Sequence, residues 1–239
     1  MNYTAKLLNR EVIAEGTMAF RFEKPEGFEF QPGQFCFIVL PDIGFKDERG
    51  LRRHLSIASS PLEKELMFAT KISDSAFKKT LKEIPIGVDV AIEKPLGSFT
   101  LMEDTAIPVV FLAAGIGITP FLSMVRYMAG VPTKQSITLF YSNRTPEEAA
   151  FLEELQSIAE MHKNIALVAT MTRVSETSET SGWLTGRISP SMIINGCREW
   201  RDAVYYIAGP PGMVDGMREM LEGMNIVSGR IKTEKFTGY

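Results

Sequence analysis

The sequence predicts two domains: an antiparallel β-barrel over residues 1–103, followed by an α/β domain with a doubly wound parallel sheet over residues 104–239. The length of 239 residues suits one large domain or two of roughly 100–150 residues each. The first part contains short runs rich in β-branched and aromatic residues, whereas the second alternates longer apolar runs with helix signals. With 45% hydrophobic and 23% charged residues, the composition is that of a globular protein.

The first domain is predicted to contain six short strands, over residues 3–13, 17–23, 34–40, 54–58, 66–72 and 89–93. Turn residues such as Pro32-Gly33 separate them, and short strands at this spacing are typical of a small antiparallel barrel. One helix is predicted over residues 76–81, where Asp74 or Ser75 can cap its first amides.

In the second domain, apolar runs of the buried-strand type alternate with helix starts. The runs cover residues 108–113, 136–141, 165–171 and 203–208. Thr119-Pro120 predicts a helix with threonine as N-cap, and residues 145–148 predict another with a capping box. Ser189-Pro190 and Pro210-Pro211 begin two more helices. Repeated βα units of this kind imply a parallel, doubly wound sheet.

Charge and cysteine content exclude two classes of protein. Lysines and arginines number 26 against 29 acidic residues, and the net charge of −3 argues against a nucleic-acid surface. The two cysteines, Cys36 and Cys197, lie far apart and outside any CxxC motif, which excludes a four-thiolate zinc or iron–sulfur site. Demanding redox chemistry would therefore need an organic cofactor.

Residues 105–125 carry no charge and are long enough to cross a bilayer. Pro108, Gly115, Gly117 and Pro120 interrupt this segment, so we interpret it as a buried strand, a glycine loop and a helix start. The first dozen residues contain charged side chains and no apolar signal-peptide core, which favours a cytoplasmic protein.

A glycine loop, Gly-Ile-Gly-Ile-Thr-Pro over residues 115–120, follows a predicted buried strand and opens a helix. Glycines let backbone amides approach a pyrophosphate, and free N–H groups at a helix start attract its charge. A plain tight turn is the alternative. Ser142, Arg144 and Arg173 follow the next two strands, at the edge where an open parallel sheet binds ligands. Since no acidic residue stands there to hold a ribose hydroxyl, the arginines either face a 2′-phosphate or are solvated.

Basic residues precede the strand predicted over residues 54–58. Arg53 can bind phosphate oxygens through two hydrogen bonds, and the nearby Ser56 hydroxyl can hydrogen-bond a ring nitrogen. Thr70-Lys71 ends another strand, and Ser75 opens the helix, whose amides offer a second phosphate contact. A solvated, arginine-rich strand edge is the alternative.

The order of these segments carries a resemblance. Arg53-His54-Leu55-Ser56 is followed by Lys71, Ser75, Gly97-Ser98-Phe99, the 115–120 loop, Gly209-Pro210-Pro211-Gly212-Met213 and Glu234-Lys235-Phe236. Over essentially its whole length the chain resembles the ferredoxin–NADP⁺ reductase family of flavoproteins, most specifically at residues 115–120 and 209–213. The resemblance implies a flavin-binding barrel and a nicotinamide-nucleotide-binding α/β domain, with a C-terminal tail that covers the flavin.

The resemblance also implies roles for individual residues. Arg53 would bind the flavin pyrophosphate, and Ser56 would hydrogen-bond the flavin near N5, the atom that accepts hydride. Glu234 and Phe236 match a carboxylate and a ring-stacking aromatic, so Ser56, Glu234 and Phe236 are the expected catalytic residues. The expected cofactor-binding residues are Arg53, His54, Leu55, Ser56, Thr70, Lys71, Ser75, Phe77, Gly115, Gly117, Ile118, Thr119, Pro120, Ser142, Arg144, Arg173, Gly209, Pro210, Met213 and Phe236, and no metal site is expected.

Three positions depart from the family pattern. Leu55 stands in the place of an aromatic residue that stacks on the flavin, and Ala208 replaces a cysteine that sits against the nicotinamide. Residues 237–239 extend the chain beyond Phe236, and Tyr239 offers a competing aromatic ring.

The function that the resemblance implies is the passage of electrons from NAD(P)H through FAD to a separate acceptor. A ferredoxin-like protein, an oxygenase component, free flavin or a small molecule are the candidate acceptors. FMN is the alternative flavin, and only a loose match at Thr172-Arg173 favours NADP(H) over NAD(H). A non-catalytic nucleotide-binding module without flavin and an electron-transfer subunit of a larger complex are the alternative functions.

Overall fold

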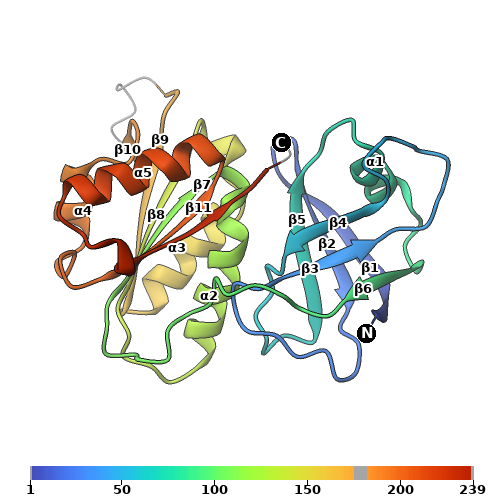
Figure 1. Ribbon diagram of the computed structural model, residues 1–239, viewed down its shortest axis with the longest axis horizontal. Helices are drawn as coiled ribbons and strands as arrows, with labels where there is room; N and C mark the ends of the chain where they lie inside the picture. Colours follow the sequence, from blue (N-terminus) through green and yellow to red (C-terminus); the bar gives the residue numbers. More distant parts are fainter. Residues whose placement is uncertain (1, 175–181, 238–239) are drawn as a thin grey trace.

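The computed structural model describes residues 2–174 and 182–237, which form two six-stranded sheets lying side by side (Figure 1). One sheet is antiparallel and the other parallel, so the predicted fold class is confirmed. Among the described residues, no helix is both long enough and apolar enough to cross a membrane.

The antiparallel sheet has the strand order β4-β3-β6-β1-β2-β5. Its two outer strands meet just after β4, where the Ala58 amide donates to Met67 O at 2.7 Å, and this contact closes the sheet into a barrel. Helix α1 adds Phe77 and Leu81 to the barrel core. The elements are β1 (Asn2–Ala14), β2 (Thr17–Glu23), β3 (Phe35–Val39), β4 (Arg52–Ser56), β5 (Glu65–Lys71), α1 (Ala76–Glu83) and β6 (Asp89–Glu93).

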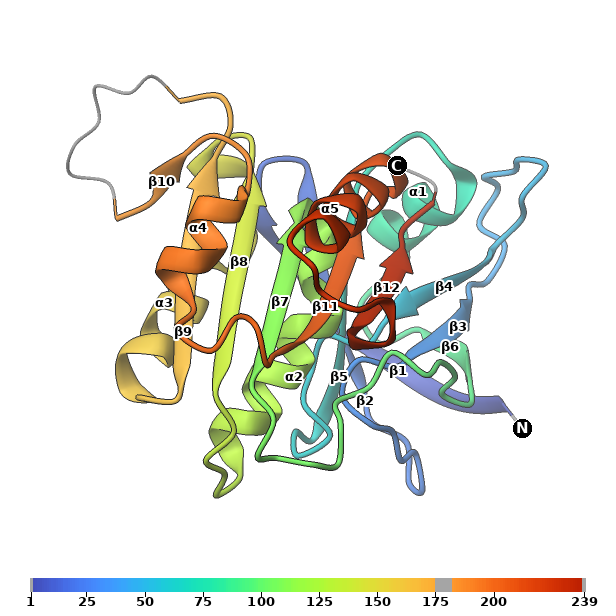
Figure 2. The ribbon, with the colours of Figure 1, turned by 60° about the vertical axis from the view of Figure 1, so that its left-hand side comes forward.

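The parallel sheet has the order β10-β9-β8-β7-β11-β12, with β12 at the edge nearest the barrel (Figure 2). Its strands are β7 (Val109–Ala114), β8 (Ile137–Asn143), β9 (Ile165–Met171), β10 (Leu184–Thr185), β11 (Val204–Gly209) and β12 (Ile231–Lys235). Its helices are α2 (Ile118–Gly130), α3 (Leu152–Met161), α4 (Pro190–Gly196) and α5 (Pro211–Gly223). Helices α2 and α3 pack on one face of the sheet, and α4 and α5 pack on the other.

The prediction that Thr119 caps α2 is wrong, because the helix begins before Thr119. A 3₁₀ turn over Gly115–Gly117 leads directly into the helix, which begins at Ile118 rather than after Thr119. The Thr119 hydroxyl lies inside the first turn and donates to Ile116 O at 3.0 Å. The glycine loop therefore winds into the helix earlier than its Thr-Pro signal indicates.

The predicted capping box at residues 145–148 is also wrong. Thr145 begins only a 3₁₀ turn over Pro146–Glu148, without a side-chain cap, and α3 starts at Leu152. Phe151 has a left-handed φ of 61°, which interrupts the helical path between turn and helix. Of the two predicted caps of α1, Asp74 and Ser75, the structure shows Ser75, whose side chain accepts an amide hydrogen bond from the helix. Ser189, at the predicted start of α4, caps that helix in the same way.

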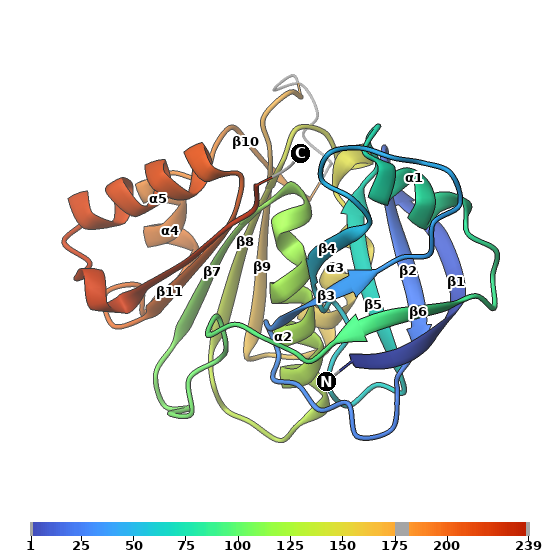
Figure 3. The same cartoon turned by 45° about the vertical axis from the view of Figure 1, so that its right-hand side comes forward.

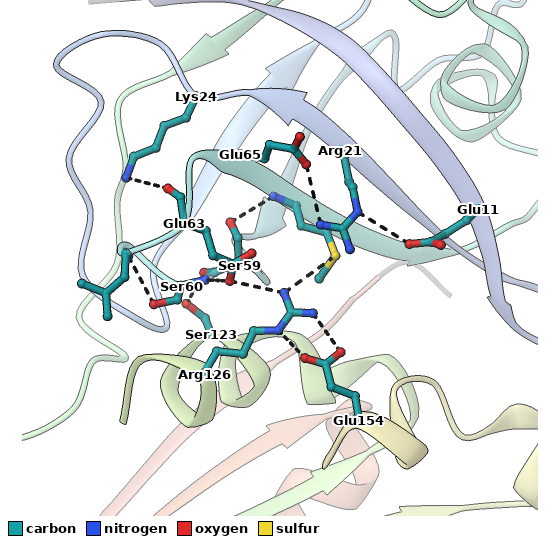
Figure 4. Close-up of polar contacts among 12 residues, drawn as sticks. Glu11, Arg21, Lys24, Ser59, Ser60, Glu63, Glu65, Ser123, Arg126 and Glu154 are labelled. Carbon is teal, nitrogen blue, oxygen red and sulfur yellow. Dashed lines mark hydrogen bonds and ion pairs between the residues drawn. The ribbon is translucent and has the colours of Figure 1, made fainter. Parts of the chain in front are cut away.

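The two domains share one core. Helix α2 lies between the parallel sheet and the barrel (Figure 3), and its apolar face packs with Ala58, Met67 and Ala69 of the barrel. Polar contacts lock the same surface (Figure 4). Arg126 of α2 binds Glu154 of α3 through two hydrogen bonds of 2.6 and 2.8 Å and reaches Glu63 of the barrel at 3.4 Å. We infer that the space between the domains is held in a fixed shape.

Candidate functional site

A pocket of about 290 Å³ lies between the two domains, where the end of β4 and the start of α1 face the glycine loop and β12. The predicted site residues that line it are Arg53, His54, Leu55, Ser56, Thr70, Ser75, Phe77, Thr119, Glu234 and Phe236. Apart from Lys71, the structure thus brings the predicted flavin residues of the barrel together with Glu234 and Phe236 of the C-terminal tail.

One end of this pocket is strongly basic. Arg49, Arg53 and Lys78 all line it. Burial lowers the pKa of Lys78, and repulsion from the two arginines lowers it further. Burial followed by repulsion from Arg49 likewise lowers the pKa of Arg53. Mutual repulsion of this kind is relieved when an anion binds among the cations, so this end of the pocket suits a phosphate group.

The Arg53 guanidinium is only partly satisfied within the protein. Its Nη1 donates to the carbonyls of Arg49 and Arg52, and its Nη2 lies 3.7 Å from Asp47 Oδ1. Nη2 is buried and has no hydrogen-bond partner among the residues that the structure describes. A buried donor without an acceptor is costly, which fits an oxygen ligand at this position.

The start of α1 lies beside the basic end. Ser75 caps the helix by accepting the Lys78 amide at 3.4 Å, and the Asp47 carboxylate accepts the Ala76 amide at 2.7 Å. The helix dipole adds positive potential in the same place. Phe77, the second residue of the helix, lines the pocket next to Arg53.

The middle of the pocket is formed by the second half of β4. Ser56 is 7% exposed, and Leu55 is half-buried beside it. The His54 ring lies between Phe35 and Phe37, with centroid distances of 5.4 and 5.6 Å. Partial burial, and then the charge of Arg53, lowers the pKa of His54, which favours the neutral ring.

The opposite wall comes from β12 and the residues after it. Strand β12 pairs in parallel with β11, and the Phe236 amide extends this pairing by donating to Gly209 O at 2.9 Å. Burial raises the pKa of Glu234 to about 7. Within residues 2–174 and 182–237, the buried Glu234 Oε2 has no hydrogen-bond partner. Glu234 is therefore able to hold or release a proton near neutral pH.

The glycine loop packs against the end of β11. A Cβ atom on Gly117 would lie 2.4 Å from the carbonyl oxygen of Ala208, so only glycine allows this approach. Gly115 has a left-handed φ of 52°, and its carbonyl accepts a hydrogen bond from the Tyr141 hydroxyl at 3.2 Å. These contacts bring Ile116 and Thr119 to the pocket.

Comparison with known proteins identifies this arrangement. Residues 111–219 match the model of the oxidoreductase NAD-binding domain family. The structure of a cytochrome P450 reductase from Amycolatopsis is similar over 100% of this chain and 70% of its own length, with a TM-score of 0.84 and 22% identity. A ferredoxin NADP⁺ reductase from Neisseria gonorrhoeae, solved with bound FAD and NADP, is similar over 98% of both chains, with a TM-score of 0.79 and 20% identity. The chain has the ferredoxin–NADP⁺ reductase fold. The resemblance inferred from the motifs is confirmed.

Two curated relatives are longer than this reductase-like chain. The reductase component of propane 2-monooxygenase from Rhodococcus jostii is 28% identical over 224 residues, which are 90% of this chain and 57% of that protein. The electron transfer component of anthranilate 1,2-dioxygenase from Acinetobacter baylyi is 27% identical over 233 residues, which are 95% of this chain and 64% of that protein. The chain thus spans about three fifths of the length of these relatives.

The remaining predicted residues lie in the reductase fold outside the pocket lining. Arg144 lies 3.9 Å from Glu148, and Lys71 Nζ lies 3.3 Å from the same carboxylate. The Arg173 amide donates to Arg144 O at 2.9 Å, which places both residues at the carboxyl edge of the parallel sheet. The other predicted residues outside the lining are Gly115, Gly117, Ile118, Pro120, Ser142, Gly209, Pro210 and Met213, and all follow or end strands at this edge.

Sequence reasoning missed several residues that line the pocket: Arg49, Ala69, Ser73, Lys78, Ile116, Lys235 and Thr237. Ile116 and Lys235 lie inside recognised motifs, so their place beside predicted site residues could have marked them as lining the pocket. Arg49 lies in a polar loop, where an arginine is usually solvated and no pattern marks it. Residues 238 and 239 of the predicted tail lie outside the described residues.

Proposed function

We propose that the chain binds FAD in the pocket between its domains and passes electrons from NAD(P)H through that flavin to a separate acceptor. The observation that carries the proposal is the convergence of three cations, the Ser56 hydroxyl and the Glu234 carboxyl in one pocket. A diphosphate fits the basic end, since Arg53 Nη2 is a buried donor that lacks an acceptor. The bound flavin would supply the electron chemistry, and the chain supplies binding and orientation.

In this proposal each wall has its own task. Arg53 and the α1 start hold the diphosphate, while Ser56 offers a hydroxyl to the polar edge of the ring system. Burial raises the pKa of Glu234 to about 7, so its carboxyl, with Oε2 buried, can hold a proton near neutral pH. Phe236 covers the ring face that a nicotinamide needs. The second domain offers the 115–120 loop to the nicotinamide nucleotide.

The test compares two neighbouring arginines. Arg53→Ala should raise the dissociation constant of FAD about 10–150-fold, the loss expected for one charge-assisted contact of roughly 1.5–3 kcal/mol. Arg52→Ala is the matched control, since Arg52 binds Glu93 through hydrogen bonds of 2.6 and 2.8 Å instead of lining the pocket. Equal FAD affinity of wild type and Arg53→Ala would remove Arg53 from the site. Extraction and identification of the bound flavin distinguishes FAD from FMN.

For the acceptor, we propose a protein of the oxygenase type or a ferredoxin-like protein. The proposal is supported by the matched relatives, which are reductase and electron transfer components of oxygenases. For the donor, we propose NADPH over NADH, with Arg173 facing the 2′-phosphate. Steady-state reduction of ferricyanide with either nucleotide, followed by candidate ferredoxins, tests both proposals.

A nucleotide-binding module without flavin is the second candidate, because Leu55 and Ala208 replace family residues. Ala208 is fully buried in the core that the two domains share. The purified protein's colour separates the candidates. A colourless chain that FAD does not reconstitute would favour the module and overturn the proposed reductase.

A further inference from the structure

Arg49 lies in the loop between β3 and β4 and lines the pocket, although it belongs to none of the motifs that carried the resemblance. Its backbone carbonyl accepts a hydrogen bond from Arg53 Nη1. After burial, its charge is the largest influence that lowers the pKa of Lys78. Arg49 therefore belongs to the basic end of the pocket, although the residue as a whole remains exposed.

Asp47 holds the loop that carries Arg49. Its Oδ1 accepts the Arg49 amide at 2.9 Å and lies 3.7 Å from Arg53 Nη2. Its Oδ2 accepts the Ala76 amide at the start of α1 at 2.7 Å. One carboxylate therefore joins the loop, the arginine of β4 and the helix start. Asp47 is not among the described residues that line the pocket, so it contacts Arg49 and Arg53 without lining the pocket itself.

We propose that Arg49 is a second arginine that binds the flavin phosphate, beside Arg53, and that Asp47 is the positioning residue that holds it there. The inference rests on the proposed function, since its ligand is the phosphate of the flavin. Guanidinium groups bind phosphate through paired N–H donors, and two of them beside an ammonium match the charge of a phosphate or diphosphate. Asp47 offsets part of the repulsion among these cations and fixes the loop.

The first experiment measures dissociation constants of FAD, FMN and riboflavin by quenching of flavin fluorescence. Arg49→Ala should weaken FAD and FMN about tenfold, as expected for a lost charge-assisted hydrogen bond, and leave riboflavin, which has no phosphate, unchanged. Lys46→Ala is the matched control, because it removes a cation from the same loop that is ion-paired with Asp42 at 3.7 Å. An equal loss of affinity for riboflavin, or no loss for FAD, overturns the role of Arg49.

The second experiment is a double-mutant cycle on FAD affinity. Asp47→Ala should weaken FAD about fivefold alone and by a smaller factor in the Arg49→Ala background, where only the contacts of Asp47 with Arg53 and the α1 start remain to be lost. Asp47→Asn keeps one of the two oxygen acceptors but loses the charge, so it should restore only part of the affinity. Asp42→Ala, which loses a similar bond to the Gly44 amide at 2.8 Å, should have no effect.

The outcomes separate this inference from the proposed function. If Asp47→Ala tightens FAD binding, or if its effect multiplies with that of Arg49→Ala, Asp47 does not position Arg49. If the wild-type chain binds none of the three flavins, the proposed function fails and the inference fails with it. If FAD binds and Arg49→Ala binds it equally well, only the inference fails.

Discussion

Replacing Glu234 by glutamine should make the folded chain more stable at alkaline pH. Burial raises the pKa of Glu234 from 4.5 to about 7, so the folded state favours the protonated carboxyl. This stabilisation is complete below the unfolded pKa near 4.5 and is lost as the pH rises towards 7. Each pKa unit corresponds to about 1.4 kcal/mol, so ionised Glu234 costs the fold about 3 kcal/mol at pH 8 and less than about 1 kcal/mol at pH 5.

Thermal unfolding of the chain at both pH values, without added flavin, measures this difference. About 2.5 kcal/mol corresponds to at least about 5 °C in a domain pair of this size. The advantage of Glu234→Gln over wild type in Tm should thus be larger at pH 8 than at pH 5 by that amount. Glu219→Gln, at an exposed position of α5, should show no such pH dependence. A Glu234→Gln advantage that is the same at both pH values would refute the assigned pKa.

Three further changes test the loop, the nucleotide preference and the covering ring. Gly117→Ala should lower the free energy of unfolding by roughly 1–3 kcal/mol, because its Cβ would lie 2.4 Å from Ala208 O. Gly216→Ala, with open space around its Cβ, should not destabilise the chain, and unfolding in urea measures both variants. Arg173→Ala should lower the ratio of kcat/KM for NADPH over NADH about tenfold, and an unchanged ratio contradicts the 2′-phosphate contact. Phe236→Ser should tighten NAD(P)⁺ binding roughly 2–12-fold in a titration, since the ring no longer competes, whereas lower Tm with unchanged affinity would make Phe236 a core residue.

The barrel and the parallel sheet were predictable because their strands carry strong apolar patterns. The predicted bounds of β2, β6 and β9 agree with the structure to the residue. Strand β12 lacks this signal, since its sequence Ile-Lys-Thr-Glu-Lys has one buried side chain. It forms because β11 offers an edge for parallel pairing, and pairing with a neighbour is invisible in a local pattern.

Helix starts were predicted less well where tertiary contacts decide them. The Thr145-Pro146 signal is a good local cap, but the Tyr141 hydroxyl binds Ala150 O at 3.2 Å and the Phe151 side chain packs against the shared core. These contacts hold the chain out of the helix until Leu152. The packing of a partly buried aromatic residue thus prevails over a hydrogen bond worth about 1 kcal/mol.

The candidate site was predictable where motifs exist, and its electrostatics were not. Arg53, Ser56 and Glu234 were found from their motifs, and the structure brings them to one pocket. Arg49 and Asp47 belong to a loop without regular pattern, and their importance appears only when the loop reaches α1. The raised pKa of Glu234 also depends on burial in the folded chain, which no single segment of sequence specifies.

If a nicotinamide enters the pocket, as proposed above, the anchoring of β12 limits how the pocket can open to it. The Phe236 amide is bonded to Gly209 O, and the preceding residues pair with β11 along their length. Removing the whole strand would break these backbone hydrogen bonds, and each buried donor or acceptor left without a partner costs free energy. Rotation of the Phe236 side chain about its own bonds leaves these backbone hydrogen bonds intact. Any displacement of the ring is therefore expected to begin at Phe236 itself, while Glu234 stays in position on the pocket wall.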